Sequence, residues 1–145
     1  MSLPYERATS GSRAVQDISK ILRGFGCSKF GSMIDDDAQE LIVQFEFRGR
    51  GVLVKASIQG YAAAWLKAHP GRGATSRLRM ERKAKEIAST AVYSILRDWI
   101  KGQVTAVETG ILTFEGAFLG QLLLPSGQTV LDMVNSKHLL AKPAS

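Results

Sequence analysis

Hydrophobic and polar residues alternate most regularly in the stretch LIVQFEFRGRGVLVKASI, residues 41–58. Side chains at every second position of a strand share a face, so this alternation predicts two strands that each bury one face. The basic interruption Arg48-Gly49-Arg50-Gly51 between them is expected to form a hairpin turn. An earlier strand is predicted over Lys29–Ile34, joined through Asp35-Asp36-Asp37 because aspartate favours turns. Residues 28–59 should therefore form a three-stranded antiparallel meander, with an outward face that carries Gln44, Glu46, Arg48, Lys55, Ser57 and Gln59.

Apolar residues spaced by three and four predict helices on both sides of this sheet. The first is an amphipathic helix over Arg13–Arg23, with Ser12 as its N-cap and glycines at its end. One or two helical turns are expected over residues 61–67, followed by a loop through the breaker at residues 69–73. A long helix should begin at Ser76, reach about residue 100 and continue through Gly102 as far as Glu108.

The C-terminal third is apolar and divided by turn and cap signals. Thr113 can cap a short helix over Phe114, Phe118 and Leu119, and Thr129 with Asp132 has the spacing of a capping box. Between these helices, Pro125-Ser126-Gly127 predicts a turn. Together the elements predict an α+β domain over residues 13–136: an N-terminal helix, a three-stranded antiparallel sheet, a long helix packed on it and short C-terminal helices. A flexible arm, residues 1–12, and a tail, residues 137–145, are expected to flank it.

Composition narrows the partners of this domain. The chain has 145 residues, 19 lysines and arginines and 13 acidic residues, which gives a formal charge of +6 and favours polyanionic partners. Cys27 is the single cysteine, so it excludes an internal disulfide and a four-thiolate zinc site. The N-terminus lacks the apolar stretch of a signal peptide, and no segment has the length of a membrane span. These features predict an intracellular protein without a membrane partner.

Cations gather most densely in the segment LKAHPGRGATSRLRMERKAKE, where Glu81 is the only acid between residues 67 and 85. Cations at a helix start oppose the helix dipole, and a bound anion would remove this conflict. The alternative is a solvated helix face with a Glu81–Lys85 pair. The hairpin tip and Trp65, as a base-stacking side chain, are further candidates. Together, the basic segment, the hairpin strands and Trp65 give the predicted nucleic-acid-binding residues: Arg48, Arg50, Lys55, Trp65, Lys67, Arg72, Arg77, Arg79, Arg82, Lys83 and Lys85.

Signals for catalysis are sparse. His69 and His138 have no neighbour at metal-ligand spacing, and Cys27 has no activating partner close in sequence. Asp35, Asp36, Asp37 and Glu46 could supply carboxylates to Mg²⁺. A run of aspartates is also typical of an ordinary turn that binds no metal. No phosphate-binding or dinucleotide-binding loop is present. We therefore expect a protein that is not an enzyme and that uses no metal or cofactor.

The order helix, three antiparallel strands, helix resembles the double-stranded-RNA-binding domain, and RKAKEIASTAVYSIL (Arg82–Leu96) is similar to that family's second helix. This resemblance implies that Arg82, Lys83 and Lys85 contact phosphates across a groove. Two features depart from the family. The turn at residues 35–40 is acidic where the family inserts a loop into the minor groove, and the segment before the second helix is longer.

KFGSM, FEFRGRGV and VETGILTFEGAFLGQLLLPSGQTV (Val107–Val130) resemble a family of small proteins encoded by tailed bacteriophages and prophages. The resemblance covers Arg13–Val134 and implies a protein that works in the cytoplasm of a bacterial host. A meander backed by a long helix is also similar to the core of phage single-strand annealing proteins.

Two functions follow as expectations. The first is non-catalytic binding of DNA or RNA in phage DNA metabolism, either of the single-strand binding and annealing type or to a duplex. The second is a protein-interaction module that inhibits or adapts a host enzyme through Phe114, Phe118 and Leu122–Leu124. The long helix and this leucine-rich segment also predict a homo-oligomer.

Overall fold

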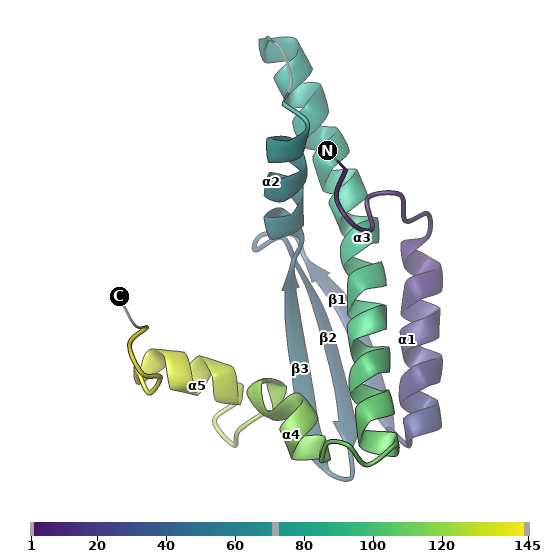
Figure 1. Ribbon diagram of the computed structural model, residues 1–145, viewed down its shortest axis with the longest axis vertical. Coiled ribbons are helices and arrows are strands. Elements are labelled where there is room, and N and C mark those ends of the chain that lie inside the picture. Colours follow the sequence, from purple (N-terminus) through teal and green to yellow (C-terminus); the bar gives the residue numbers. More distant parts are fainter. Residues whose placement is uncertain (1, 71–72, 144–145) are drawn as a thin grey trace.

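The three predicted strands form one antiparallel sheet in the order β1-β2-β3. The computed structural model describes residues 2–70 and 73–143, and its fold is α+β, as predicted (Figure 1). In chain order the elements are α1 (Gly11–Phe25), β1 (Lys29–Asp35), β2 (Glu40–Phe47), β3 (Arg50–Ser57), α2 (Ile58–Ala68), α3 (Ala74–Glu108), α4 (Phe114–Phe118), the 3₁₀ helix η1 (Leu119–Gln121) and α5 (Val130–Ser136).

One face of the sheet makes the hydrophobic core. Val43 pairs with Val54 and Phe45 with Val52, so these side chains share a face, and all four are buried. Helices α1 and α3 lie side by side over this face (Figure 1). The opposite face carries exposed polar residues such as Gln44 and Lys55, as the alternation predicts.

The β2–β3 hairpin is tighter than the expected four-residue interruption. Its turn contains only Arg48 and Gly49, with φ of +49° and +80°, which is the backbone pattern of a type I′ turn. Gly51 lies within β3, where an added Cβ would come within 3.0 Å of Leu123 Cδ1. The predicted outward face was wrong in two places, because Arg48 belongs to this turn and Gln59 to α2.

The helices extend further than the apolar periodicity indicates. Helix α1 begins at Gly11, and its N-cap is Ser10 rather than Ser12, since the Ser10 hydroxyl accepts from the Arg13 N–H at 3.2 Å. Helix α2 follows β3 without a loop residue and is capped by Ser57. Helix α3 runs for 35 residues through Gly102 to Glu108, and it starts two residues before the expected Ser76.

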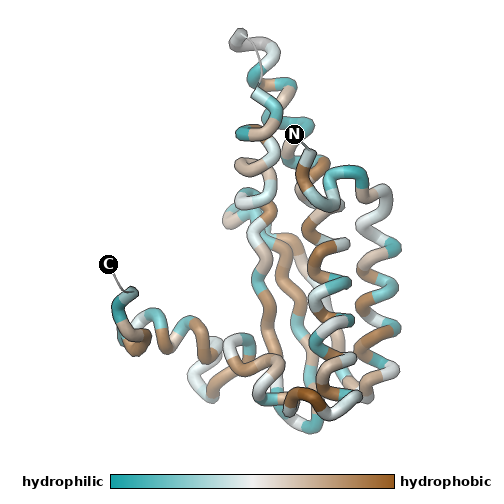
Figure 2. Tube along the Cα trace, in the orientation of Figure 1, coloured by the Kyte–Doolittle hydropathy of each residue, from teal (hydrophilic) through white to brown (hydrophobic). Residues whose placement is uncertain are grey.

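The C-terminal caps are confirmed. The Thr113 hydroxyl accepts from the Gly116 N–H at 2.9 Å, and Thr129 forms a capping box with Asp132. Helix α4 packs into the core beside the C-terminal end of α3, whereas α5 has no buried residue and extends to the side (Figure 1). Colouring by hydropathy shows mostly apolar strands and a mostly pale or hydrophilic start of α3 (Figure 2). No helix of the described residues has the length and hydropathy to cross a membrane.

Candidate nucleic-acid interface

The largest group of exposed cations lies where α2 and the start of α3 extend beyond the end of the sheet (Figure 1). We call this group the basic helix end. All six members are exposed: Lys67, Arg77, Arg79, Arg82, Lys83 and Lys85. Arg72, which the sequence also assigns to this region, lies outside the described residues. The start of α3 has Gly73 at its N-cap, no side-chain cap and no acid in its first turn.

Three of these cations form a ridge along α3. Residues spaced by three are neighbours on a helix surface, about 5–6 Å apart, so Arg79, Arg82 and Lys85 follow one another. At about 100° per residue, this ridge lies on the side opposite the fully buried Ala84 and Ala88. Glu81 pairs with Arg77 at 3.8 Å and not with Lys85 as the solvated-face interpretation expected, so the ion pair lies outside the ridge.

Trp65 is not available for stacking on a base, so that part of the prediction was wrong. Its side chain is 2% exposed, because α2 packs along α3 and encloses it. The indole stacks on His69 with ring centroids 4.3 Å apart, and its Nε1 has no hydrogen-bond partner among the described residues. Lys83 Nζ lies 6.0 Å from the Trp65 ring centroid and extends the cationic surface over it.

The cations of the hairpin lie away from the basic helix end. Arg48 and Arg50 line a cavity of about 520 Å³ together with Val107 at the other end of α3. Val107 and Arg82 are 25 residues apart on α3, which corresponds to about 38 Å at about 1.5 Å per residue. The structure therefore divides the predicted residues into two groups, with Lys55 between them on the outer face of β3.

Both tip arginines already have partners in the protein. The Arg48 guanidinium lies 5.0 Å from the Phe47 ring centroid, and Arg50 Nε is 3.5 Å from Glu115 Oε1. Two acidic residues, Glu108 and Glu115, line the same cavity. The tip is therefore close to neutral, whereas the ridge on α3 is not.

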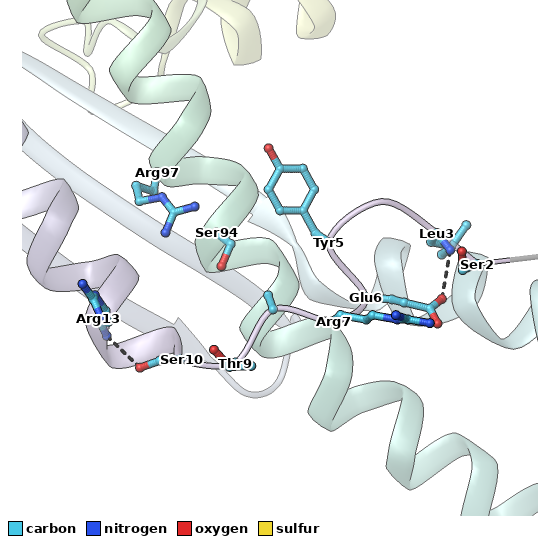
Figure 3. A pocket seen from close by; sticks show the side chains of 11 residues that line it. Ser2, Leu3, Tyr5, Glu6, Arg7, Thr9, Ser10, Arg13, Ser94 and Arg97 are labelled. Atoms are coloured by element: carbon cyan, nitrogen blue, oxygen red, sulfur yellow. Dashed lines mark hydrogen bonds between the residues drawn. The ribbon is translucent and has the colours of Figure 1, made fainter.

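A third group of arginines was missed by the sequence analysis. Arg7, Arg13 and Arg97 line a cavity of about 480 Å³ between the N-terminal residues, the start of α1 and the middle of α3 (Figure 3). We call it the arm cavity. Residues 7 and 97 are 90 positions apart, so no local pattern indicates that they line one cavity.

The carboxylates considered for Mg²⁺ have structural contacts. Asp35 Oδ1 accepts from the backbone N–H groups of Asp37 and Ala38, both at 3.1 Å, so it stabilises the β1–β2 turn. Glu46 forms an ion pair with Lys29 at 3.4 Å. Among residues 2–70 and 73–143, no three metal-binding side chains are grouped.

Most of the apolar surface expected for a protein partner is buried, and Leu123 and Leu124 are half-buried. Phe114, Phe118 and Leu122 are 8%, 0% and 6% exposed, because α4 and η1 close one end of the core. Exposed apolar side chains occur elsewhere in the C-terminal third: Ile111, Leu112, Leu119, Leu131, Leu139 and Leu140.

Comparisons with protein-family models, with curated protein sequences and with solved structures gave no match to this chain.

Proposed function

We propose that this protein is a non-catalytic nucleic-acid-binding protein, and that the basic helix end is the surface that contacts phosphates. The observation that supports the proposal is the exposed ridge of Arg79, Arg82 and Lys85 at a projecting helix start. The nearest acids along α3 are Glu81, which pairs with Arg77, and Glu86. A surface of this kind attracts the phosphate backbone and releases its counterions.

The local physics of α3 favours an anion at this end. The N-cap of the helix is Gly73, and neither a capping side chain nor an acid in the first turn offsets the helix dipole. Backbone N–H groups at such an end attract anions, and the arginines add to this attraction. The setting we propose, phage DNA metabolism in the cytoplasm of a bacterial host, rests on the resemblance to phage proteins.

The alternative proposal is a protein-interaction module, which would inhibit or adapt a host enzyme or join copies of this chain. It is favoured by one observation: α5 has no buried residue and exposes Leu131, and Leu139 and Leu140 follow it. An exposed apolar group on a projecting segment is typical of a protein contact. Binding to a protein through these apolar side chains would depend only weakly on salt, whereas binding to phosphates would weaken steeply as salt rises.

The test compares two triple variants with the same change in charge. Arg79→Gln/Arg82→Gln/Lys85→Gln removes the ridge, and Lys20→Gln/Arg23→Gln/Lys101→Gln removes three exposed cations of α1 and α3 that lie outside it. Fluorescence anisotropy with labelled single- and double-stranded DNA and RNA, over a salt series, measures affinity. We expect the ridge variant to lower the slope of log K against log salt by about 2–3, since each phosphate contact contributes about 0.9.

The control variant should keep the slope of the wild type. Equal losses in both variants would indicate attraction to net charge without a site. An absence of binding at low salt would reject the proposed function and leave the protein-interaction module.

A further inference from the structure

Three arginines from three separate segments of the chain line the arm cavity, where Arg7 extends alongside Glu6 on the side away from Arg13 and Arg97 (Figure 3). Arg7 comes from the residues before α1, Arg13 from the first turn of α1, and Arg97 from the middle of α3 (Figure 3). Hydroxyl groups of Thr9, Ser10 and Ser94 line the same space of about 480 Å³. Arginine forks and hydroxyl groups are the side chains that proteins use to bind phosphate oxygens.

Two of these arginines have no acid to neutralise them. Within the described residues, no carboxylate oxygen lies within 4 Å of the side-chain nitrogens of Arg7 or Arg13, whereas such pairs exist for Arg97. Glu6 also lines the cavity, but its carboxylate accepts from the Leu3 N–H at 2.9 Å and lies 3.7 Å from His69 Nε2. Like charges repel when no anion lies between them, so the cavity favours an anionic ligand.

Arg97 is held in place by the protein. Its Nε donates to Asp98 Oδ1 at 3.0 Å, and its Nη1 lies 3.8 Å from Asp17 Oδ2. The Tyr5 hydroxyl donates to the other oxygen of Asp98 at 2.5 Å. These two hydrogen bonds, the one from Arg97 first, lower the pKa of the Asp98 carboxyl. One carboxylate thus fixes both an arginine of the cavity and the segment that forms its wall.

The N-terminal wall has a second attachment. The Tyr61 hydroxyl of α2 donates to the Pro4 carbonyl at 2.6 Å, and Glu6 lies beside His69 at the end of α2. Tyr5 has a φ of +68°, a left-handed conformation that is unfavourable for a non-glycine residue. Contacts on both sides of Tyr5 therefore maintain a strained backbone that keeps Arg7 at the cavity.

The start of α1 adds to the positive potential. Its first turn contains Arg13 and no acid, and the Ser10 hydroxyl caps the N–H of Arg13. The helix dipole and the arginine thus have the same sign at this end, and an anion compensates both. Since Arg7 and Arg97 belong to other segments, the helix end is only one of several contributions.

We propose that the arm cavity binds a phosphate group, either of a small phosphomonoester or of a nucleic acid. The site is separate from the basic helix end, and it does not require that surface to function. Arg7 and Arg13 supply the uncompensated charge, Arg97 supplies a fixed donor, and the hydroxyl groups of Thr9 and Ser10 line the space for the oxygens. The Ser94 hydroxyl donates to the Thr90 carbonyl and therefore only forms part of the wall.

Isothermal titration calorimetry on the full chain at constant ionic strength tests the proposal. The probes are inorganic phosphate, thymidine monophosphate, and a short oligonucleotide with and without a 5′-phosphate. The variants are Arg7→Gln and Arg13→Gln. Arg23→Gln is the matched control, because Arg23 is exposed at the opposite end of α1. Loss of one charge-assisted contact should weaken phosphate binding by about tenfold or more in each cavity variant. Arg23→Gln should bind as the wild type does.

The pattern across probes identifies the source of the phosphate. Binding of inorganic phosphate or the monophosphate that depends on Arg13 supports a small ligand. Binding of the oligonucleotide alone, with the same dependence on Arg13, supports a nucleic-acid phosphate. The proposal is overturned if no probe binds, or if Arg23→Gln weakens binding as much as Arg13→Gln does. The ridge variant, Arg79→Gln/Arg82→Gln/Lys85→Gln, should keep its affinity for inorganic phosphate. The proposal for the arm cavity and the proposal for the basic helix end can therefore fail separately.

Discussion

At the scale of single residues, the surroundings of a side chain decide its chemistry more than its sequence neighbours do. Cys27 shows this because Arg23 and Lys29 line the same small cavity as the thiol, and nearby cations ordinarily lower a thiol pKa. Burial has the larger effect here and raises the pKa of Cys27 to about 11. The thiolate at pH 7 is then a fraction of about one in 10⁴, which is too small for a nucleophile.

This raised pKa predicts slow alkylation of Cys27. Because the folded state holds the thiol proton more tightly than a free cysteine does, the rate of reaction with iodoacetamide should rise about tenfold per pH unit from pH 7 to 10. Mass spectrometry of the labelled protein measures the rate. The urea-unfolded chain is the control and should level off near pH 9. A plateau below pH 9 in the folded protein would show that the cations prevail.

At the scale of elements, α4 is part of the core although it contains only five residues. Phe118 contacts the rings of Phe45, Trp99 and Phe114, with centroids 5.3–5.8 Å apart. The Gln103 side chain of α3 also donates to the Ala117 carbonyl. These contacts join the C-terminal third to both the sheet and the long helix, so this element stabilises the whole fold.

Adjacent residues of this segment should therefore respond very differently to truncation. Phe118→Ala removes a fully buried ring and should lower the free energy of unfolding by about 3–5 kcal/mol. Leu119→Ala, at a residue that is 54% exposed, should change it by about 0.5 kcal/mol or less. Urea denaturation followed by circular dichroism measures both. A large loss of unfolding free energy in Leu119→Ala would mean that a second copy of the chain covers this side chain, as the protein-interaction module requires.

At the scale of the whole molecule, the basic helix end and the arginines of the hairpin tip are about 38 Å apart along α3, so a short nucleic acid cannot contact both. With about 3.4 Å per base pair, a duplex needs about 11 base pairs to span them. Under the proposed function, the length of a duplex therefore decides which cations contact it.

Charge removal at the hairpin tip tests this separation. Under the proposed function, Arg48→Gln/Arg50→Gln should leave the affinity for a duplex of about 8 base pairs unchanged, because so short a duplex would contact the basic helix end alone. On a duplex of about 20 base pairs the same variant should lower the salt slope by up to about 2 if both ends engage. Anisotropy titrations of the two lengths give the comparison. A loss of affinity for the shorter duplex would place the main contact at the tip.

The features that the sequence predicts correctly are those set by short-range patterns. The alternation at residues 41–58 gives the sheet, and Thr113 and Thr129 mark helix starts because a cap involves residues only three positions apart. Burial depends on packing between distant segments. Trp65 is enclosed because α2 lies along α3, and Phe118 is enclosed because α4 packs against the end of α3. The arm cavity could not be predicted for the same reason.

The junction between β3 and α2 has one further consequence, which concerns direction. Because Ser57 is both the last residue of β3 and the cap of α2, the strand register fixes the rotation of α2 about its own axis. Two hydrogen bonds reinforce this coupling, since the N–H groups of Ile58 and Gln59 donate to the Gln39 carbonyl. One inserted residue would turn α2 by about 100° and move Trp65 off its packed side. The length of this junction thus sets the direction in which Trp65 and Lys67 of α2 point, without any change in charge.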